Sequence, residues 1–245
     1  KSCAEFSKSY IETQRSQFKR LGVLADWEKE YRTMNPSYEA EILRTVADFV
    51  DRGLIYRSKK PIYWSIPCAT ALAEAEIEYQ DHVSPSIYVP FRIKEDLGTS
   101  MVIWTTTPWT LPANMAVAVH PREKYSKLKV GREHYWVGES LIGQFTEVCK
   151  FENFEIVDTQ EGSSLVGKEC IHPFIDRSSP ILSAEYVTMD SGTGCVHIAP
   201  GHGLDDYLTG LDNGIEVYCP LDDKGCYVAD GSIPEELTGL SVLER

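Results

Sequence analysis

The sequence predicts an α+β protein in which a short helical flank, residues 1–60, precedes a β-barrel-like domain with a few helices, residues 61–245. Three observations predict this architecture. Apolar residues recur at helical spacing before residue 53, short β-branched and aromatic runs between Gly, Pro and Asp turns follow, and a chain of 245 residues that is 42% hydrophobic can bury a core. We expect the strands to close on themselves, because closure removes exposed sheet edges.

Two helices are expected in the flank. A capping-box spacing begins at Ser2, and the apolar stripe that follows it ends at Gly22. Asn35 and Pro36 supply an N-cap and a first-turn proline for a second helix, which Gly53 ends.

The remainder is expected to be mostly strand. Residues 73–79 alternate small or apolar with acidic side chains, which favours a half-exposed strand although Ala and Glu prefer helices. Helices are expected at 140–149 and 204–213, and a hairpin turn at 222–225. The other runs that predict strands are 86–93, 101–107, 115–120, 125–130, 134–137 and 185–190.

Composition is typical of a cytoplasmic protein with reduced thiols. No apolar run approaches the roughly 18 to 20 residues of a membrane span, and the N-terminus lacks a signal-peptide profile. The seven cysteines are odd in number and scattered, in a chain too long to need disulfides. The chain starts at Lys1 without a methionine and opens into a helical pattern, so we expect a piece of a longer protein.

The net charge of −13 is unevenly distributed. Residues 1–60 carry 12 basic and 9 acidic side chains, a net charge of +3, whereas residues 161–245 carry 4 and 15, a net charge of −11. Because the acidic part repels phosphates, bulk duplex binding is disfavoured, and only a short, specifically held nucleic-acid end could approach it.

The first unusual segment is WTTTPWTLPAN, residues 104–114. Three threonines at a strand end place hydroxyls on both faces of the sheet, and Pro108 and Pro112 force the chain to leave the ladder. A strand end lined with hydroxyls in this way, called the threonine rim below, can hold a small polar ligand. The alternative is an ordinary Thr-rich strand followed by proline turns.

The second unusual segment is DSGTGCVHIAPGHGLDDY, residues 190–207. Its four glycines allow close backbone approach, and His197, His202, Asp205 and Asp206 crowd titratable groups into ten positions. The two aspartates could instead merely cap a helix.

A thiol hydrolase is an alternative chemistry for this segment. Cys195 and His197 lie two residues apart on an expected strand and would face the same side, as a thiol nucleophile and its base would. Zinc is not expected, because the chain has no CxxC pair and the Cys and His spacings match no usual finger. The other histidines, which we expect at surface or satisfied core positions, are His82, His120, His134 and His172.

Together the two segments strongly resemble the editing domain inserted into the catalytic domain of isoleucyl-tRNA synthetases, class I enzymes. The stretch FKRLGVLADWEKEYRTMNPSYEAEI resembles the helical segment before that insertion, and KPIYWSIPCATALAEAEIEY resembles its entry ribbon. Pro108 and Trp109 point to the isoleucyl member, since the valyl and leucyl relatives carry an arginine and an acidic residue inside the threonine motif. Ser65 stands where some relatives have the first cysteine of a CxxC.

The resemblance implies hydrolytic editing of mischarged valyl-tRNA(Ile), without a metal or other cofactor. Asp206 would bind the α-ammonium of the substrate, Thr105, Thr106 and Thr107 would line the pocket with hydroxyls, and His197 would be the wall that limits side-chain size. Trp109 and Asn114 would shape the mouth or contact the nucleotide. The implied substrate-binding set also includes Trp104, Gly194 and Gly203.

The resemblance also implies partners and limits. The implied partners are the aminoacylated 3′ end of tRNA(Ile), a valine or valyl-adenylate moiety, and the remainder of the synthetase. The chain has no HIGH-like or KMSKS-like sequence, so we do not expect it to aminoacylate. A non-catalytic module that binds the tRNA 3′ end is the alternative from another class.

Overall fold

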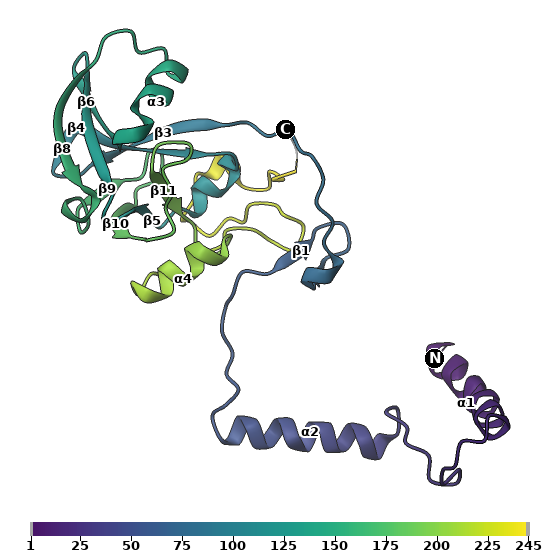
Figure 1. Ribbon diagram of the computed structural model, residues 1–245. Helices are drawn as coiled ribbons and strands as arrows, with labels where there is room; N and C mark the ends of the chain where they lie inside the picture. The colour runs from purple at the N-terminus through teal and green to yellow at the C-terminus, as the bar shows by residue number, and fades with distance from the viewer. Residues whose placement is uncertain (1, 244–245) are drawn as a thin grey trace. The chain divides into compact units, whose positions relative to one another are not determined.

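A computed structural model of the chain describes residues 2–243, which form two compact units, one up to Ser58 and one from Lys59 onward (Figure 1). The expected ranges 1–60 and 61–245 extend outside the described residues at residue 1 and at residues 244–245.

The first unit contains the two predicted helices, α1 (Ser2–Arg20) and α2 (Pro36–Asp51). Asn35 has the extended backbone of an N-cap, but its side chain makes no cap hydrogen bond. Its backbone oxygen instead accepts the N–H of Tyr38 at 2.9 Å. Gly53 has a φ of +69°, the left-handed conformation that glycine supplies after a helix.

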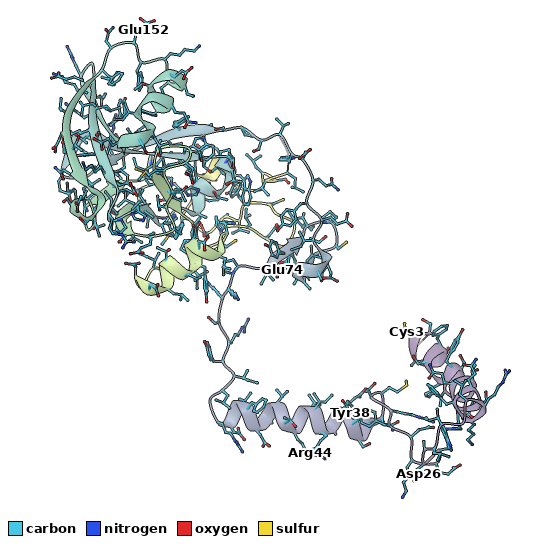
Figure 2. The ribbon with its side chains drawn as sticks, in the orientation of Figure 1. Cys3, Asp26, Tyr38, Arg44, Glu74 and Glu152 are labelled. Carbon is cyan, nitrogen blue, oxygen red and sulfur yellow. The ribbon has the colours of Figure 1, made fainter. Side chains whose placement is uncertain are left out.

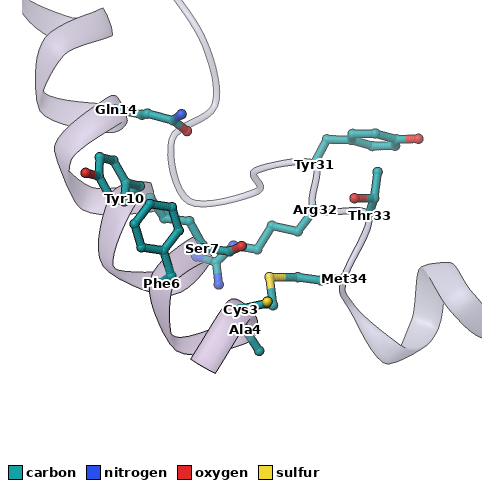
Figure 3. A pocket seen from close by; sticks show the side chains of 11 residues that line it. Cys3, Ala4, Phe6, Ser7, Tyr10, Gln14, Tyr31, Arg32, Thr33 and Met34 are labelled. Atoms are coloured by element: carbon teal, nitrogen blue, oxygen red, sulfur yellow. The ribbon is translucent and has the colours of Figure 1, made fainter. Parts of the chain in front are cut away.

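No residue of α1 or α2 is buried. Figure 2 shows side chains projecting all around α2, where Tyr38 and Arg44 are labelled. A hollow of about 680 Å³ lies between α1 and residues 31–34, and Figure 3 shows Arg32 extending from this segment toward α1. The exposed large apolar side chains of α2 are Ile42, Leu43, Val46, Phe49 and Val50.

The second unit is built on a nine-stranded mixed sheet of order β11-β5-β10-β9-β3-β4-β7-β6-β8. The pairs β5–β10 and β4–β7 are parallel, and the remaining pairs of this sheet are antiparallel. The strands are β3 (Ile87–Ile93), β4 (Asp96–Thr105), β5 (Ala116–Val119), β6 (Lys124–Val130), β7 (Glu133–Gly138), β8 (Glu155–Glu161), β9 (Glu169–Ile171), β10 (Ser178–Ser183) and β11 (Cys195–Ile198).

Short elements complete this unit. A small hairpin pairs β1 (Tyr63–Ser65) with β2 (Thr70–Leu72). The helices α3 (Ile142–Val148) and α4 (Leu204–Asp212) lie within the two predicted helical ranges. The 3-10 turns are η1 (Glu74–Glu76), η2 (Pro108–Ala113), η3 (Glu139–Leu141), η4 (Gly162–Ser164) and η5 (Glu235–Leu237).

The sheet curls around one apolar core but does not close. Phe91, Met101, Val117 and Tyr125 are fully buried in a cluster that draws on eight of the nine strands, and β11 also packs against β4. Among the described residues, β11 and β8 remain the two ends of the sheet, so the expected closure is wrong while the α+β, barrel-like fold is confirmed. Strand β8 carries a charged side chain at each end and one in the middle, Glu155, Asp158 and Glu161, which suits an edge that faces water.

Two predicted strands are wrong. Within residues 73–79 the chain forms the turn η1 and then continues without regular structure, and the Glu76 carboxylate accepts the Ala73 N–H at 2.7 Å. Residues 185–190 are turn and bend, since the chain leaves the sheet after β10. The remaining predicted strands are confirmed within a few residues, and the turn at 222–225 is closed by the Asp222 N–H to Cys226 O bond of 2.9 Å.

Candidate active site

The two unusual segments lie side by side. Strand β5, which follows residues 104–114, pairs antiparallel with β11 of the second segment, and Val117 lies opposite His197. Just before β5, the Met115 N–H donates to the Ile198 oxygen at 2.8 Å. The sheet therefore places the threonine segment beside the segment that carries His197 and Asp206.

The threonines lie where β4 ends and η2 begins. Thr105 is buried, and its Oγ1 accepts the Thr107 N–H at 3.1 Å. Thr106 and Thr107 are exposed. Pro108 then starts η2, which turns the chain away from the sheet. The structure thus leaves two threonine side chains accessible at the rim, while the third stabilises the turn.

Three histidines hold three consecutive residues of η2. The ring of His202 makes an edge-on contact with Trp109 at a centroid distance of 5.3 Å. His197 Nε2 lies 3.0 Å from the Thr110 hydroxyl, and His172 Nε2 lies 2.9 Å from the Leu111 oxygen. Burial lowers the pKa of each ring to about 4, so all three are neutral at physiological pH.

Hydrogen bonding assigns the tautomer of His197. The Thr110 hydroxyl donates its proton to the Thr107 oxygen at 2.9 Å, so it accepts from His197, whose Nε2 carries the hydrogen. Nδ1 is then an acceptor. This atom is buried and has no hydrogen-bond partner in the structure. Because an unpaired buried acceptor is costly, a water or ligand that donates a hydrogen bond to Nδ1 would be stabilised there.

Asp206 lies in the first turn of α4, and its Oδ2 accepts the Ala199 N–H at 3.1 Å. Burial, assisted by the neighbouring charge of Asp205, raises the pKa of Asp206 to about 6, although the Ala199 bond and the Tyr186 hydroxyl act in the opposite direction. Gly203 packs closely against this carboxylate, because a Cβ atom there would lie 3.0 Å from Asp206 Oδ2. The carboxylate is therefore half-buried, bonded to a backbone N–H and ionised at neutral pH.

The expected glycine positions serve close packing. A Cβ atom at Gly192 would lie 2.9 Å from the Trp104 ring, which is a further contact between the two segments. Gly194 has a φ of +71°, and a Cβ atom there would lie 2.6 Å from the Met189 sulfur. Its oxygen accepts the Tyr125 hydroxyl at 2.6 Å.

Trp109 and Asn114 lie in different environments. Trp109 is 36% exposed, and its backbone oxygen accepts the Tyr227 hydroxyl. Asn114 is fully buried: its Nδ2 donates to Ala116 O at 2.8 Å, and its Oδ1 accepts from Ser179 at 2.6 Å. Trp109 can therefore border a ligand, whereas the Asn114 amide is already occupied by protein groups.

The sequence did not single out Thr110, His172, Arg177 or Tyr186. Thr110 lies inside the threonine segment but contacts a ring 87 residues away. His172 occupies a satisfied core position, as expected, yet its partner belongs to the site. The signal for these residues is tertiary, and no local pattern contains it.

The structure argues against a thiol nucleophile. Cys195 is 2% exposed within the apolar core, and burial raises the pKa of its thiol far above neutrality. The Nε2 of His197 is bonded to Thr110 and not to the sulfur. Within residues 2–243, no three His, Cys, Asp or Glu side chains are grouped so as to bind a metal ion, and no helix is long and apolar enough to cross a membrane.

Known proteins resemble most of this chain. Isoleucine–tRNA ligases from Petrotoga mobilis, Nitratidesulfovibrio vulgaris strain Miyazaki F and Thermotoga maritima are 47%, 48% and 49% identical over 93%, 100% and 94% of it. The aligned regions are 25%, 27% and 25% of those proteins, so the chain spans about a quarter of their length.

Solved structures show weaker likeness. A structure described as GlLeuRS-CP1 has a TM-score of 0.41 and 23% identity, covering 48% of this chain and 47% of that one. The editing domain of the P. falciparum cytosolic leucyl-tRNA synthetase has a TM-score of 0.39 and 17% identity, covering 44% of each chain. The family model of tRNA synthetases class I (I, L, M and V) matches residues 1–208, and the chain belongs to this family.

Proposed function

We propose that this chain is an editing domain that hydrolyses the ester of valyl-tRNA(Ile) and does not itself ligate amino acids. The observation that carries the proposal is the contact between the two segments, made by Thr110 with His197 and by Trp109 with His202. These contacts hold the segment with the accessible threonine hydroxyls against the segment that carries the half-buried Asp206 carboxylate.

The need for such a site follows from the energetics of recognition. A pocket that accepts isoleucine rejects valine only weakly, because one methylene is worth about 1–3 kcal/mol, a magnitude for which isoleucyl-tRNA synthetase is itself the standard example. A second, smaller pocket discriminates by steric exclusion. Adding a methylene to a tight site costs about 1–3 kcal/mol, so valine enters and isoleucine does not seat productively.

Asp206 is the proposed anchor of the substrate. An ionised carboxylate binds the α-ammonium of an aminoacyl ester through a charge-assisted hydrogen bond. The Ala199 N–H fixes one carboxylate oxygen and leaves acceptor capacity on the carboxylate for the ammonium. Anchored in this way, the ester carbonyl has one orientation relative to the threonine rim.

The chemistry requires positioning more than a strong nucleophile. An aminoacyl ester is already activated, so one oriented water and relief of the developing negative charge suffice. Exposed Thr106 and Thr107 supply hydroxyl donors toward the substrate and the terminal adenosine. His197, neutral and held by Thr110, forms the wall that limits the side chain.

The proposed partners are the aminoacylated end of tRNA(Ile) and the rest of a synthetase. Support for the second comes from α2, whose apolar side chains are exposed in this chain, and from relatives of which this chain spans a quarter. Support for the first comes from the basic residues 1–60, which suit a phosphate backbone.

The test measures release of amino acid from valyl-tRNA(Ile) and isoleucyl-tRNA(Ile) by the whole chain, with uncatalysed hydrolysis subtracted. We expect the valyl ester to react about 10- to 100-fold faster, as the steric cost predicts. Asp206→Ala should lower the rate for valyl-tRNA(Ile) to that of uncatalysed hydrolysis. Asp205→Ala, a change at the neighbouring exposed carboxylate, should leave the catalysed rate in place. Tight binding of deacylated tRNA without ester turnover would favour the non-catalytic module instead.

A further inference from the structure

The loop between β9 and β10 meets the threonine segment through backbone oxygens. From this loop, His172 Nε2 donates to Leu111 O at 2.9 Å. Arg177 Nη1 donates to Pro112 O at 3.1 Å and to Asn114 O at 2.8 Å. Side chains from one short loop thus satisfy three carbonyl groups of residues 111–114.

This loop is itself rigidly built. The His172 N–H donates to the Arg177 oxygen at 3.0 Å, which ties the two ends of the loop together. The Ile175 N–H donates to His172 Nδ1 at 3.2 Å, which requires the hydrogen of the neutral ring to be on Nε2, facing Leu111 O. The two side chains therefore act from one preorganised unit, which we name the 172–177 clamp.

Two of these carbonyls need such partners because of their place in the chain, whereas Leu111 O also accepts the Asn114 N–H at 2.9 Å. Pro112 and Asn114 lie at the end of η2, where the last carbonyl groups of a helix have no intrahelical donor. A carbonyl left unpaired beside the core destabilises the fold, because it loses its hydrogen bonds to water without a replacement. The fork of Arg177 suits the task, since one Nη1 reaches two oxygens while Nη2 bonds Ser232 O at 3.2 Å.

We propose that Arg177 is a positioning residue for the editing reaction: with His172, it fixes residues 111–114 and thereby holds Trp109 and Thr110 against the rings of His202 and His197. Arg177 acts through this loop and does not contact the substrate. The inference rests on the proposed function. According to this inference, the clamp sets the distance between the threonine hydroxyls and His197. It thereby determines how well the site discriminates between valine and isoleucine.

The first test is Arg177→Lys in the whole chain. An ammonium cannot reproduce the planar fork to three carbonyls. Because misplacement by about 1 Å can cost about 100-fold in rate, we expect kcat for valyl-tRNA(Ile) to fall about 10- to 100-fold, with KM changed less than about 3-fold. Amide hydrogen exchange over residues 109–114 should rise. Arg122→Lys is the matched control, because that guanidinium is exposed and pairs with Glu185 on the surface.

The second test is chemical rescue. A cavity of about 440 Å³ is lined by Arg177 and residues 231–234, so guanidinium ion can reach the place of a deleted side chain. Arg177→Ala should regain at least several-fold in kcat with millimolar guanidinium and nothing with equal ammonium. A purely structural role predicts instead a lower folded fraction, with unchanged kcat per folded molecule and no rescue.

The outcomes separate this inference from the proposed function. If the parent chain hydrolyses valyl-tRNA(Ile) and Arg177→Lys leaves both kcat and the exchange of residues 109–114 unchanged, the positioning role is refuted. Raised exchange with unchanged kcat refutes its part in the reaction. If the parent shows no hydrolysis, the proposed function fails, and the exchange measurement alone decides whether the clamp holds the loop.

Discussion

The burial of Asp206 predicts that a substitution which destroys editing makes the protein more stable. The pKa of this carboxyl is raised from 3.8 to about 6, a difference of about two units. At about 1.4 kcal/mol per unit, keeping it ionised in the folded state costs about 3 kcal/mol at pH 8. Asp206→Asn has the same shape, can still accept the Ala199 N–H, and removes this cost.

The direction of this pKa shift determines the pH range over which the two variants differ in stability. A carboxyl whose folded-state pKa is raised binds its proton more tightly when folded, so it favours folding at low pH and disfavours it as pH rises through about 4 to 6. Relative to the parent, Asp206→Asn should gain about 2–3 kcal/mol at pH 8, about half of that at pH 5, and about a fifth of it at pH 4. The valyl-tRNA(Ile) activity should be lost throughout.

Urea unfolding followed by tryptophan fluorescence measures this gain. Trp27→Phe in every variant restricts the signal to tryptophans of the unit from Lys59 onward. Asp205→Asn removes the same charge from an exposed neighbour and should change stability by less than about 0.5 kcal/mol. A gain that is equal at pH 5 and pH 8, or a loss of stability at pH 8, would refute the burial argument.

Three further predictions concern the same site. His197→Ala should let the chain deacylate isoleucyl-tRNA(Ile) at least about 10-fold faster than the parent does, while circular dichroism verifies folding; a valyl preference that survives intact would show that the wall is elsewhere. The kcat/KM for valyl-tRNA(Ile) should fall as pH drops through about 6, where Asp206 takes up a proton, and should also fall above about 8, where an α-ammonium is lost; a flat profile between pH 5 and 7 contradicts the anchor. Iodoacetamide should leave turnover unchanged, because Cys195 is buried and protonated; inactivation that tracks labelling of this thiol would restore the nucleophile.

Local sequence signals predicted the elements that depend on local physics. Caps and apolar periodicity located α1 and α2, and β-branched runs located β3 to β7. The alternation of residues 73–79 failed because the Glu76 side chain can bond to the nearby backbone, which favours a tight turn over a strand. The strand β9 was missed because its three residues, Glu169–Ile171, are held by its neighbours and carry no periodic signal of their own.

In the candidate site, too, the residues in distinctive local segments were predictable, and those that act through tertiary contacts were not. Asp206, His197 and the threonines stand in dense segments with an unusual composition, so the sequence alone located them. Thr110 and Arg177 could not be assigned, because their roles come from hydrogen bonds across 87 and 65 residues of chain to a ring and to backbone oxygens. Backbone oxygens are present at every position, so a side chain that binds them leaves no motif.

Occupancy by a non-hydrolysable valyl-adenosine analogue tests the central claim most directly. In a crystal of the whole chain soaked with this compound, the account predicts the α-ammonium on the Asp206 carboxylate, the valyl side chain against His197, and the adenosine along Thr106 and Thr107. Density for the analogue away from these residues, for example in the cavity beside Arg177, with the Asp206 carboxylate left without a ligand, would contradict it.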